Sequence, residues 1–220
     1  LKMLKHHKIP VRSDEVRESC EGCLQGKKPR GTVPQSSEHP ATVTLQIIHS
    51  DICGPFPESI TQRIKYFITF VDEFSRYLVV FGLKSKSDAF SAIKRYIKMA
   101  NNHFLNQGFS VQYFQSDNGS EYCSRRTQDF FSDNGITHRC SVPYQPEQNG
   151  IAERINRSIL ESAQSMRLTA KLPTQFWWLA ASTAAFIYNR RPHSSFPEYS
   201  TPYQKWHNQD EDISSLRVFG

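Results

Sequence analysis

The stretch VTLQIIHSDICGP, residues 43–55, sets the first element of the fold. Val43, Leu45 and Ile47 alternate with polar residues, which is the period of a half-buried β-strand. The apolar run ends in HSD just before a Gly-Pro pair, so we expect Asp51 at the end of this strand. Strand ends are where α/β proteins usually present catalytic side chains. Asp51 is therefore the first candidate functional residue.

The period of the apolar residues changes along the rest of the chain. Two β-prone runs at 64–71 and 77–82 flank a polar turn and indicate an antiparallel hairpin, so the first three strands form a meander. Apolar residues then recur every three or four positions over 86–105, which predicts an amphipathic helix. Further strands are expected at 111–116 and 136–140, and further helices at 125–133, 151–168 and 174–189. This order predicts an α/β fold with a mixed sheet and helices on its faces.

Two more acids stand at comparable positions. Asp117 directly follows the strand expected at 111–116, and Glu153 lies in the first turn of the helix expected at 151–168. Glu153 points away from the apolar stripe of that helix and has Asn156 and Arg157 as its i+3 and i+4 neighbours. Simpler interpretations remain open, because such acids also form turns, complement the helix dipole, or pair with a neighbour such as Arg157.

Three carboxylates that converge from two strands and a helix would suit two Mg²⁺ or Mn²⁺ ions. One ion would activate a water or a DNA 3′-hydroxyl, and the other would stabilise the leaving oxyanion of a phosphodiester displacement. Arg157 would meet a phosphate beside them. We therefore expect Asp51, Asp117 and Glu153 to be both catalytic and metal-binding.

Several sequence motifs, taken together, agree with this chemistry. HSDICGP at 49–55, QSDNGSEY at 115–122 and PYQPEQNGIAERINRSI at 143–159 each contain one of the three acids, and 35 residues separate the last two. With FVDEFSRY at 70–77 and FWWLAASTAAFIYNRRPHSS at 176–195, they resemble the blocks of copia-like LTR retrotransposon integrases, which carry the retroviral-type DD35E triad. The resemblance covers nearly the whole chain and implies a fragment of a Pol polyprotein.

This resemblance implies an RNase H-like catalytic core with a mixed five-stranded sheet flanked by helices. Such a core joins the ends of element cDNA to target DNA by transesterification, and the family's metal-binding positions match the same three acids. The resemblance also places Asn149 and Gly150 in a flexible loop ahead of the catalytic helix and gives Arg157 a DNA-facing position. The residues expected to contact DNA around this helix are Asn149, Gly150, Asn156 and Arg157. Glu121, a nearby fourth acid, is expected to be only a helix-start residue.

The head of the chain contains a possible zinc half-site. Cys20 and Cys23 have the C-x-x-C spacing that lets two thiolates chelate one Zn²⁺. The adjacent His6 and His7 would project about 100° apart on a helix, so one face could not easily supply both. By resemblance, the pair is the cysteine half of an HHCC module whose histidines lie further upstream, with two free thiols as the alternative. Three other cysteines are expected to be ordinary buried or half-buried thiols: Cys53, Cys123 and Cys140.

Positive charge is concentrated in the same segment. Residues 1–30 have a balance of +4, which leaves +2 of the formal net charge of +6 for the remainder. Lys27, Lys28 and Arg30 follow the cysteines and are candidates for nonspecific phosphate contact, against the alternative of a solvated linker flank. The arginine pairs at 125–126 and 190–191 are similar candidates. A surplus this small favours a polyanionic partner only weakly.

The composition also indicates domain boundaries and the cellular compartment that we expect for the chain. We expect a partial zinc-binding segment at 1–30, a linker at 31–42, the RNase H-like core at 43–190 and a C-terminal extension at 191–220. No apolar run reaches the 18 or so residues of a membrane span, and five scattered cysteines favour a reducing compartment. The chemistry implied by the resemblance points to a cytoplasmic particle and the nucleus. The resemblance also implies a homo-oligomer, with the helices after residue 150 as candidate interfaces.

Three functional hypotheses follow. The first is a strand transferase that acts on double-stranded DNA, and the second is a nuclease of the same fold that only hydrolyses nucleic acid. The third is a non-catalytic DNA-binding remnant, which would predict damaged acids. All three acids are present, and their spacing favours the transferase.

Overall fold

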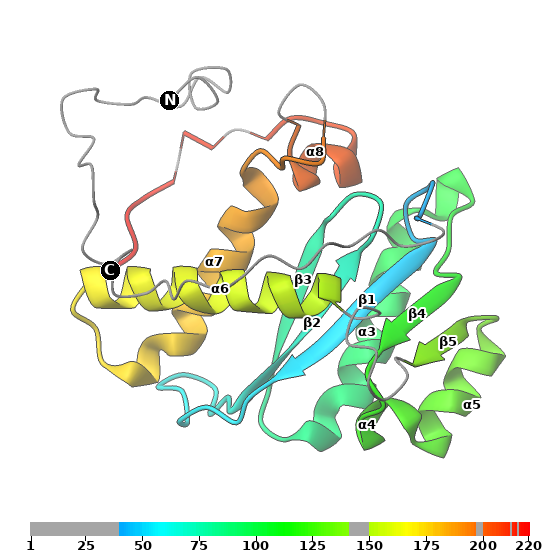
Figure 1. The fold of residues 1–220 in the computed structure, drawn as a ribbon, viewed down its shortest axis with the longest axis horizontal. Helices are drawn as coiled ribbons and strands as arrows, with labels where there is room; N and C mark the ends of the chain where they lie inside the picture. The colour runs from blue at the N-terminus through cyan, green and yellow to red at the C-terminus, as the bar shows by residue number, and fades with distance from the viewer. Residues whose placement is uncertain (1–39, 141–149, 197–199, 212, 215) are drawn as a thin grey trace.

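A single five-stranded sheet forms the centre of the computed structural model, which describes residues 40–140 and 150–220 except 197–199, 212 and 215 (Figure 1). The strand order is β3-β2-β1-β4-β5. The strands are β1 Ile47–Cys53, β2 Tyr66–Asp72, β3 Leu78–Leu83, β4 Tyr113–Ser116 and β5 Thr137–Cys140. β1, β2 and β3 form the antiparallel meander, whereas β4 pairs in parallel with both β1 and β5. The expected mixed sheet is therefore confirmed.

The helices agree with the expected periods where they are long. They are α3 Ala89–His103, α4 Ser120–Cys123, α5 Arg125–Asp133, α6 Gly150–Thr169, α7 Trp177–Arg190 and α8 Pro202–His207, with single 3₁₀ turns at Lys86–Asp88, Leu105–Gln107 and Thr174–Phe176. The sequence did not predict α4 or α8, because helices of four and six residues are too short to show a 3.6-residue period.

Both faces of the sheet are covered, which makes a three-layer α/β protein (Figure 1). One face packs against α3, α4 and α5, where Phe70 stacks on Tyr96 with ring centroids 4.4 Å apart. The other face packs against α6 and α7 through Ile155, Ile159 and the alanines of α7. Because alternate residues of β1 point to opposite layers, Asp51 faces α6.

The first strand begins later than the alternation predicted. Val43 is exposed, and Leu45 has a left-handed backbone conformation with φ of 66°, so β1 starts only at Ile47. The buried Asp72 carboxylate accepts a hydrogen bond from the Leu45 N–H at 2.8 Å, which supports this bend. The first residues of the apolar alternation therefore lie in a bend. A pattern of apolar residues alone does not distinguish such a bend from a strand.

The structure also bears on the question of a membrane-spanning helix. Of the helices in the described part of the chain, none combines the length and the apolar character that a bilayer crossing requires. The expected zinc-binding segment at 1–30 and most of the linker at 31–42 lie outside the described residues.

Candidate active site

Two of the three acids lie side by side on neighbouring strands. Asp51 lies in β1, two residues before its end, and Asp117 directly follows β4. β1 and β4 are parallel, with His49 opposite Gln115. Continued for two more residues, this register places Asp117 opposite Asp51. The parallel pairing thus brings together two acids that are 66 positions apart in the sequence.

The third acid is delivered by α6, which lies across the face of the sheet. Glu153 is exposed in the first turn of this helix. One turn later, Asn156 is 2% exposed, and its Nδ2 donates a hydrogen bond to Asp51 Oδ2 at 2.8 Å. This bond fixes α6 against β1 and holds the Glu153 end of the helix near the other acids. Asn156 Oδ1 is buried without a hydrogen-bond partner, so the amide nitrogen carries the contact with Asp51.

The pKa of Asp51 reflects its burial and the negative charges of the other two acids. Burial, followed by the negative charges of Asp117 and Glu153, raises the pKa of Asp51 from 3.8 to about 6, against the opposing hydrogen bonds from Asn156 and the Ile52 N–H. The fold therefore concentrates negative charge at the end of β1. Such clusters are common where proteins bind cations or carry out acid–base chemistry.

Carboxylate oxygens of this kind fit Mg²⁺ or Mn²⁺ better than a soft metal. The excess negative charge around Asp51 fits a cation for the same reason. However, among residues 40–140 and 150–220, outside the short gaps, no three His, Cys, Asp or Glu side chains converge closely enough to hold an ion as placed. Asp117 and Glu153 are exposed, so packing does not fix their rotamers. Their convergence on a metal is therefore part of the proposal below.

The turn after β4 is shaped around Asp117. The Gly119 N–H donates a hydrogen bond to Asp117 Oδ1 at 3.0 Å, and a Cβ at Gly119 would lie only 3.0 Å from the same oxygen. Glu121 lies in the first turn of α4, as expected, and pairs with Lys86 at 3.1 Å. Partial burial raises the pKa of Glu121, but hydrogen bonds from its own backbone and from Lys86 outweigh this and lower it overall. Glu121 is thus already neutralised by a lysine.

The residues expected to contact DNA are only partly available. Arg157 is exposed, and no ion pair joins it to Glu153, so the simple surface-pair interpretation is wrong in the described structure. Asn156 is buried against Asp51 and does not face solvent, because its amide serves the acid instead. Gly150 is the buried first residue of α6 rather than part of a loop. The remaining DNA-contact candidates, Lys27, Lys28, Arg30 and Asn149, lie outside the described residues, as do the zinc candidates Cys20 and Cys23.

Two side chains of the site were missed as functional neighbours. Asn156 was expected to contact DNA, and its position beside the apolar stripe of α6 is the signal that could have indicated a buried hydrogen bond instead. Tyr122 is fully buried, and its hydroxyl lies 3.0 Å from Ser50 Oγ beneath the acids. Burial raises the pKa of Tyr122, and the charges of Asp51 and Asp117 raise it further.

The cysteines of the core differ in part from the expectation. Cys53 and Cys140 are half-buried, but Cys123 is exposed and its Sγ lies 3.8 Å from that of Cys140. Burial, then Cys123, raises the pKa of Cys140 to about 11. His138 Nδ1 lies 3.6 Å from Cys140 Sγ, yet the described residues contain no metal-binding group here. No pattern in the sequence indicated this contact.

Comparisons with known proteins agree with the geometry. A family model described as the integrase core domain matches residues 42–146. The Retrovirus-related Pol polyprotein from transposon TNT 1-94 of Nicotiana tabacum is 39% identical over 202 residues, which cover 91% of this chain and 15% of that polyprotein. The chain thus spans a small part of the curated relatives that it matches.

Solved structures show the same fold at lower identity. The intasome of simian T-cell lymphotropic virus, in complex with a PP2A regulatory subunit, aligns with a TM-score of 0.62 at 21% identity, covering 91% of this chain and 66% of that one. The HTLV-2 integrase catalytic core domain in complex with magnesium aligns with a TM-score of 0.56 at 21% identity, covering 76% of this chain and 99% of that one. The family model and the relatives lead to one conclusion: residues 42–146 are an integrase core domain, and most of the chain is homologous to Pol polyproteins of retrotransposons.

Proposed function

We propose that this chain catalyses metal-dependent DNA strand transfer, the insertion of element cDNA into target DNA by transesterification. The observation that carries the proposal is the register that sets Asp117 opposite Asp51, together with the Asn156 hydrogen bond that holds α6 and Glu153 near them. Membership of the integrase core family supports the same reaction.

In this reaction the 3′-oxygen of the donor strand forms a bond to a phosphorus atom of the target strand. The bond from that phosphorus to the target 3′-oxygen breaks in the same displacement. The donor hydroxyl loses its proton and the released 3′-oxygen gains one, so the number of phosphodiester bonds is unchanged and no energy source is needed.

Asp51, Asp117 and Glu153 would hold two Mg²⁺ or Mn²⁺ ions. When bound, the ions would supply Lewis-acid activation of the attacking oxygen and stabilisation of the leaving one. Magnesium in the HTLV-2 core supports this choice of metal. Asn156 acts as a positioning residue, because its hydrogen bond lowers the pKa of Asp51 and favours the ionised carboxylate that a metal requires. Arg157, exposed one turn beyond Glu153, would contact a DNA phosphate.

Other features belong to the same proposal. The partners are the double-stranded element ends and the target DNA, and the active form is a homo-oligomer, as the intasome and the trimeric HTLV-2 core suggest. Zinc binding by Cys20 and Cys23, phosphate contacts by Lys27, Lys28 and Arg30, and passage from a cytoplasmic particle to the nucleus remain proposals from the sequence.

A strand-transfer assay with a labelled blunt donor duplex, a supercoiled plasmid and Mg²⁺ or Mn²⁺ tests the proposal. Glu153→Gln keeps the shape of the side chain but removes its charge, and Glu161→Gln on the same helix is the matched control. We expect joined products with the parent chain and with Glu161→Gln, and none with Glu153→Gln. Nicking without joining would favour the nuclease hypothesis, and neither product would favour the non-catalytic one.

A further inference from the structure

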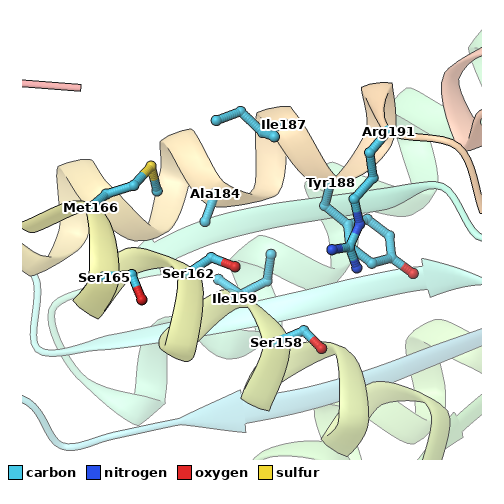
Figure 2. Close-up of a pocket in the computed structure, with 9 residues that line it drawn as sticks. All are labelled: Ser158, Ile159, Ser162, Ser165, Met166, Ala184, Ile187, Tyr188 and Arg191. Atoms are coloured by element: carbon cyan, nitrogen blue, oxygen red, sulfur yellow. The ribbon is translucent and has the colours of Figure 1, made fainter. Parts of the chain in front are cut away.

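Two free thiols lie in contact at the same end of the sheet as Asp117. Cys123 is the last residue of α4, and Cys140 is the last residue of β5. Their Sγ atoms lie 3.8 Å apart, although 17 positions separate them in the sequence. Cys53, the third cysteine in the described part of the chain, makes no such sulfur contact. The fold therefore brings Cys123 and Cys140 together as a pair. The groove between α6 and α7, lined mainly by apolar side chains, carries no comparable pair of reactive groups (Figure 2).

The pair is close to the geometry of a disulfide without having formed one. The sulfur atoms of a disulfide are about 2.05 Å apart, so the two Sγ atoms would have to approach by about 1.8 Å. Cys123 is exposed, so a small oxidant in solution can reach it. Cys140 is half-buried, and burial followed by Cys123 raises its pKa to about 11, which keeps it a thiol near neutral pH. Cys123 is thus the sulfur placed to react first.

The histidine beside the pair does not complete a metal site with it. Cys140 Sγ lies 3.6 Å from both Nδ1 and Nε2 of His138, so the sulfur lies against the ring and not in line with one nitrogen. Both nitrogens are also used: Nδ1 accepts a hydrogen bond from Gln128 Nε2 at 2.7 Å, and Nε2 lies 2.8 Å from Ser116 Oγ. Burial lowers the pKa of His138, which favours the neutral ring. Oxidation is therefore the chemistry that this arrangement leaves to the two thiols.

The pair is connected to Asp117 from both sides. Cys140 lies opposite Ser116 in the β4–β5 register, and Ser116 directly precedes Asp117. On the other side, the Cys123 N–H donates a hydrogen bond to the Gly119 carbonyl at 3.1 Å. The Gly119 N–H in turn holds Asp117 Oδ1 at 3.0 Å. A displacement of Cys123 is therefore transmitted through this turn to the Asp117 carboxylate.

We propose that Cys123 and Cys140 form a modification site, at which hydrogen peroxide produces an intrachain disulfide that shifts the Asp117 turn. In the first step the Cys123 sulfur bonds to one peroxide oxygen, the O–O bond breaks and water leaves, which gives a sulfenic acid. The Cys140 sulfur then bonds to the Cys123 sulfur and displaces the sulfenic oxygen as a second water. The two thiols lose two electrons and two protons, and the peroxide gains them. Formation of the disulfide is independent of the proposed function, whereas its effect at Asp117 rests on that function.

Peptide mapping of the whole 220-residue chain tests for the disulfide. The chain is treated with hydrogen peroxide, its remaining thiols are alkylated, and it is digested with trypsin without a reductant. Cleavage after lysine and arginine leaves Cys123 in the peptide 99–125 and Cys140 in the peptide 140–154, and neither peptide contains another cysteine. The disulfide is then identified by one linked mass, lower by two hydrogen atoms than the sum of the two peptides. Dithiothreitol should remove this mass.

The linked peptide should come from chains that remain monomeric on a non-reducing gel. We expect it in the parent and in the control variant Cys53→Ser, and not in Cys123→Ser or Cys140→Ser. A parent that yields no linked peptide, or yields it only from a covalent dimer, would overturn the proposal. Stoichiometric zinc that the parent binds and Cys123→Ser loses would overturn it as well, because the thiols would then be metal ligands.

The effect at Asp117 is measured by strand transfer before and after oxidation. The oxidised parent should lose roughly tenfold or more in joining, because a small misplacement at a reacting site is costly, and dithiothreitol should restore the rate. Cys140→Ser, which cannot form the disulfide, should join DNA equally well with and without peroxide treatment. A linked peptide with unchanged joining would refute the connection to Asp117. A linked peptide in a parent that never joins DNA would refute the proposed function while the modification site stands.

Discussion

Replacing Asp51 with asparagine should make the metal-free protein more stable at neutral pH. In the folded chain the pKa of Asp51 is about 6, against 3.8 for an unperturbed aspartate, because burial and the charges of Asp117 and Glu153 disfavour its ionised form. The folded state therefore holds this proton more tightly than the unfolded state does. Stability falls as pH rises from about 4 to about 6, and the cost is fully present above that range.

The size of the effect follows from the same values. Each pKa unit corresponds to about 1.4 kcal/mol, so ionising Asp51 costs the folded state about 3 kcal/mol at pH 7, roughly half of that at pH 5 and little at pH 4. An amide in place of the carboxylate avoids this cost. It can also keep the contact with Asn156, because that residue can turn its unpartnered Oδ1 toward the new N–H group.

Urea unfolding of the parent and of Asp51→Asn, in EDTA at pH 4, 5 and 7, measures the difference. We expect the variant to gain up to about 3 kcal/mol at pH 7, with the gain shrinking toward pH 4. Asp129→Asn, an exposed acid on α5, is the control and should change stability by less than about 0.5 kcal/mol. Mg²⁺ should stabilise the parent, by about 1.4 kcal/mol at ten times its Kd, and not the variant.

Two results would refute this reasoning. A variant that is less stable than the parent at pH 7 would show that the ionised Asp51 carboxylate does not destabilise the folded state. A gain that does not diminish between pH 7 and pH 4 would show that the stabilisation has another origin.

Three further predictions concern the same site and its core. Asn156→Ala removes a hydrogen bond that lowers the pKa of Asp51, so the acid limb of the joining rate against pH should move to higher pH, and an unshifted limb would deny the positioning role. Gly119→Ala adds a methyl group 3.0 Å from Asp117 Oδ1, so joining should fall at least tenfold while the melting temperature measured by circular dichroism changes by only a few degrees; a normal joining rate would show that the turn yields freely. Phe114→Ala should destabilise the fold by about 3 to 5 kcal/mol in urea, because the ring is fully buried; a loss below about 1 kcal/mol would contradict the described core.

The sequence predicted the elements that are long or regular. The hairpin of β2 and β3, the helix α5 and the long helix α6 were placed within a residue or two, because their apolar residues recur with a clear period. The pairing of β1 with β4 was not predicted, since strand periodicity says nothing about which strands become neighbours. At Leu45 the strand prediction was wrong, because this apolar residue fits the alternation but lies in a bend rather than in β1.

The site was predicted by residue type and not by contact. Spacing and flanking words identified the three acids, but they did not reveal that Asn156 turns inward to Asp51 instead of outward to DNA.

The central claim is that three acids, and not the fourth acid nearby, carry out strand transfer. The most direct measurement is the yield of joined DNA in Mg²⁺ for the parent and for the single variants Asp51→Asn, Asp117→Asn, Glu153→Gln and Glu121→Gln. Glu121 is paired with Lys86, so its variant should join DNA at close to the parent yield, whereas each of the other three should yield no joined product. Joining that survives the loss of any of the three acids would contradict the account.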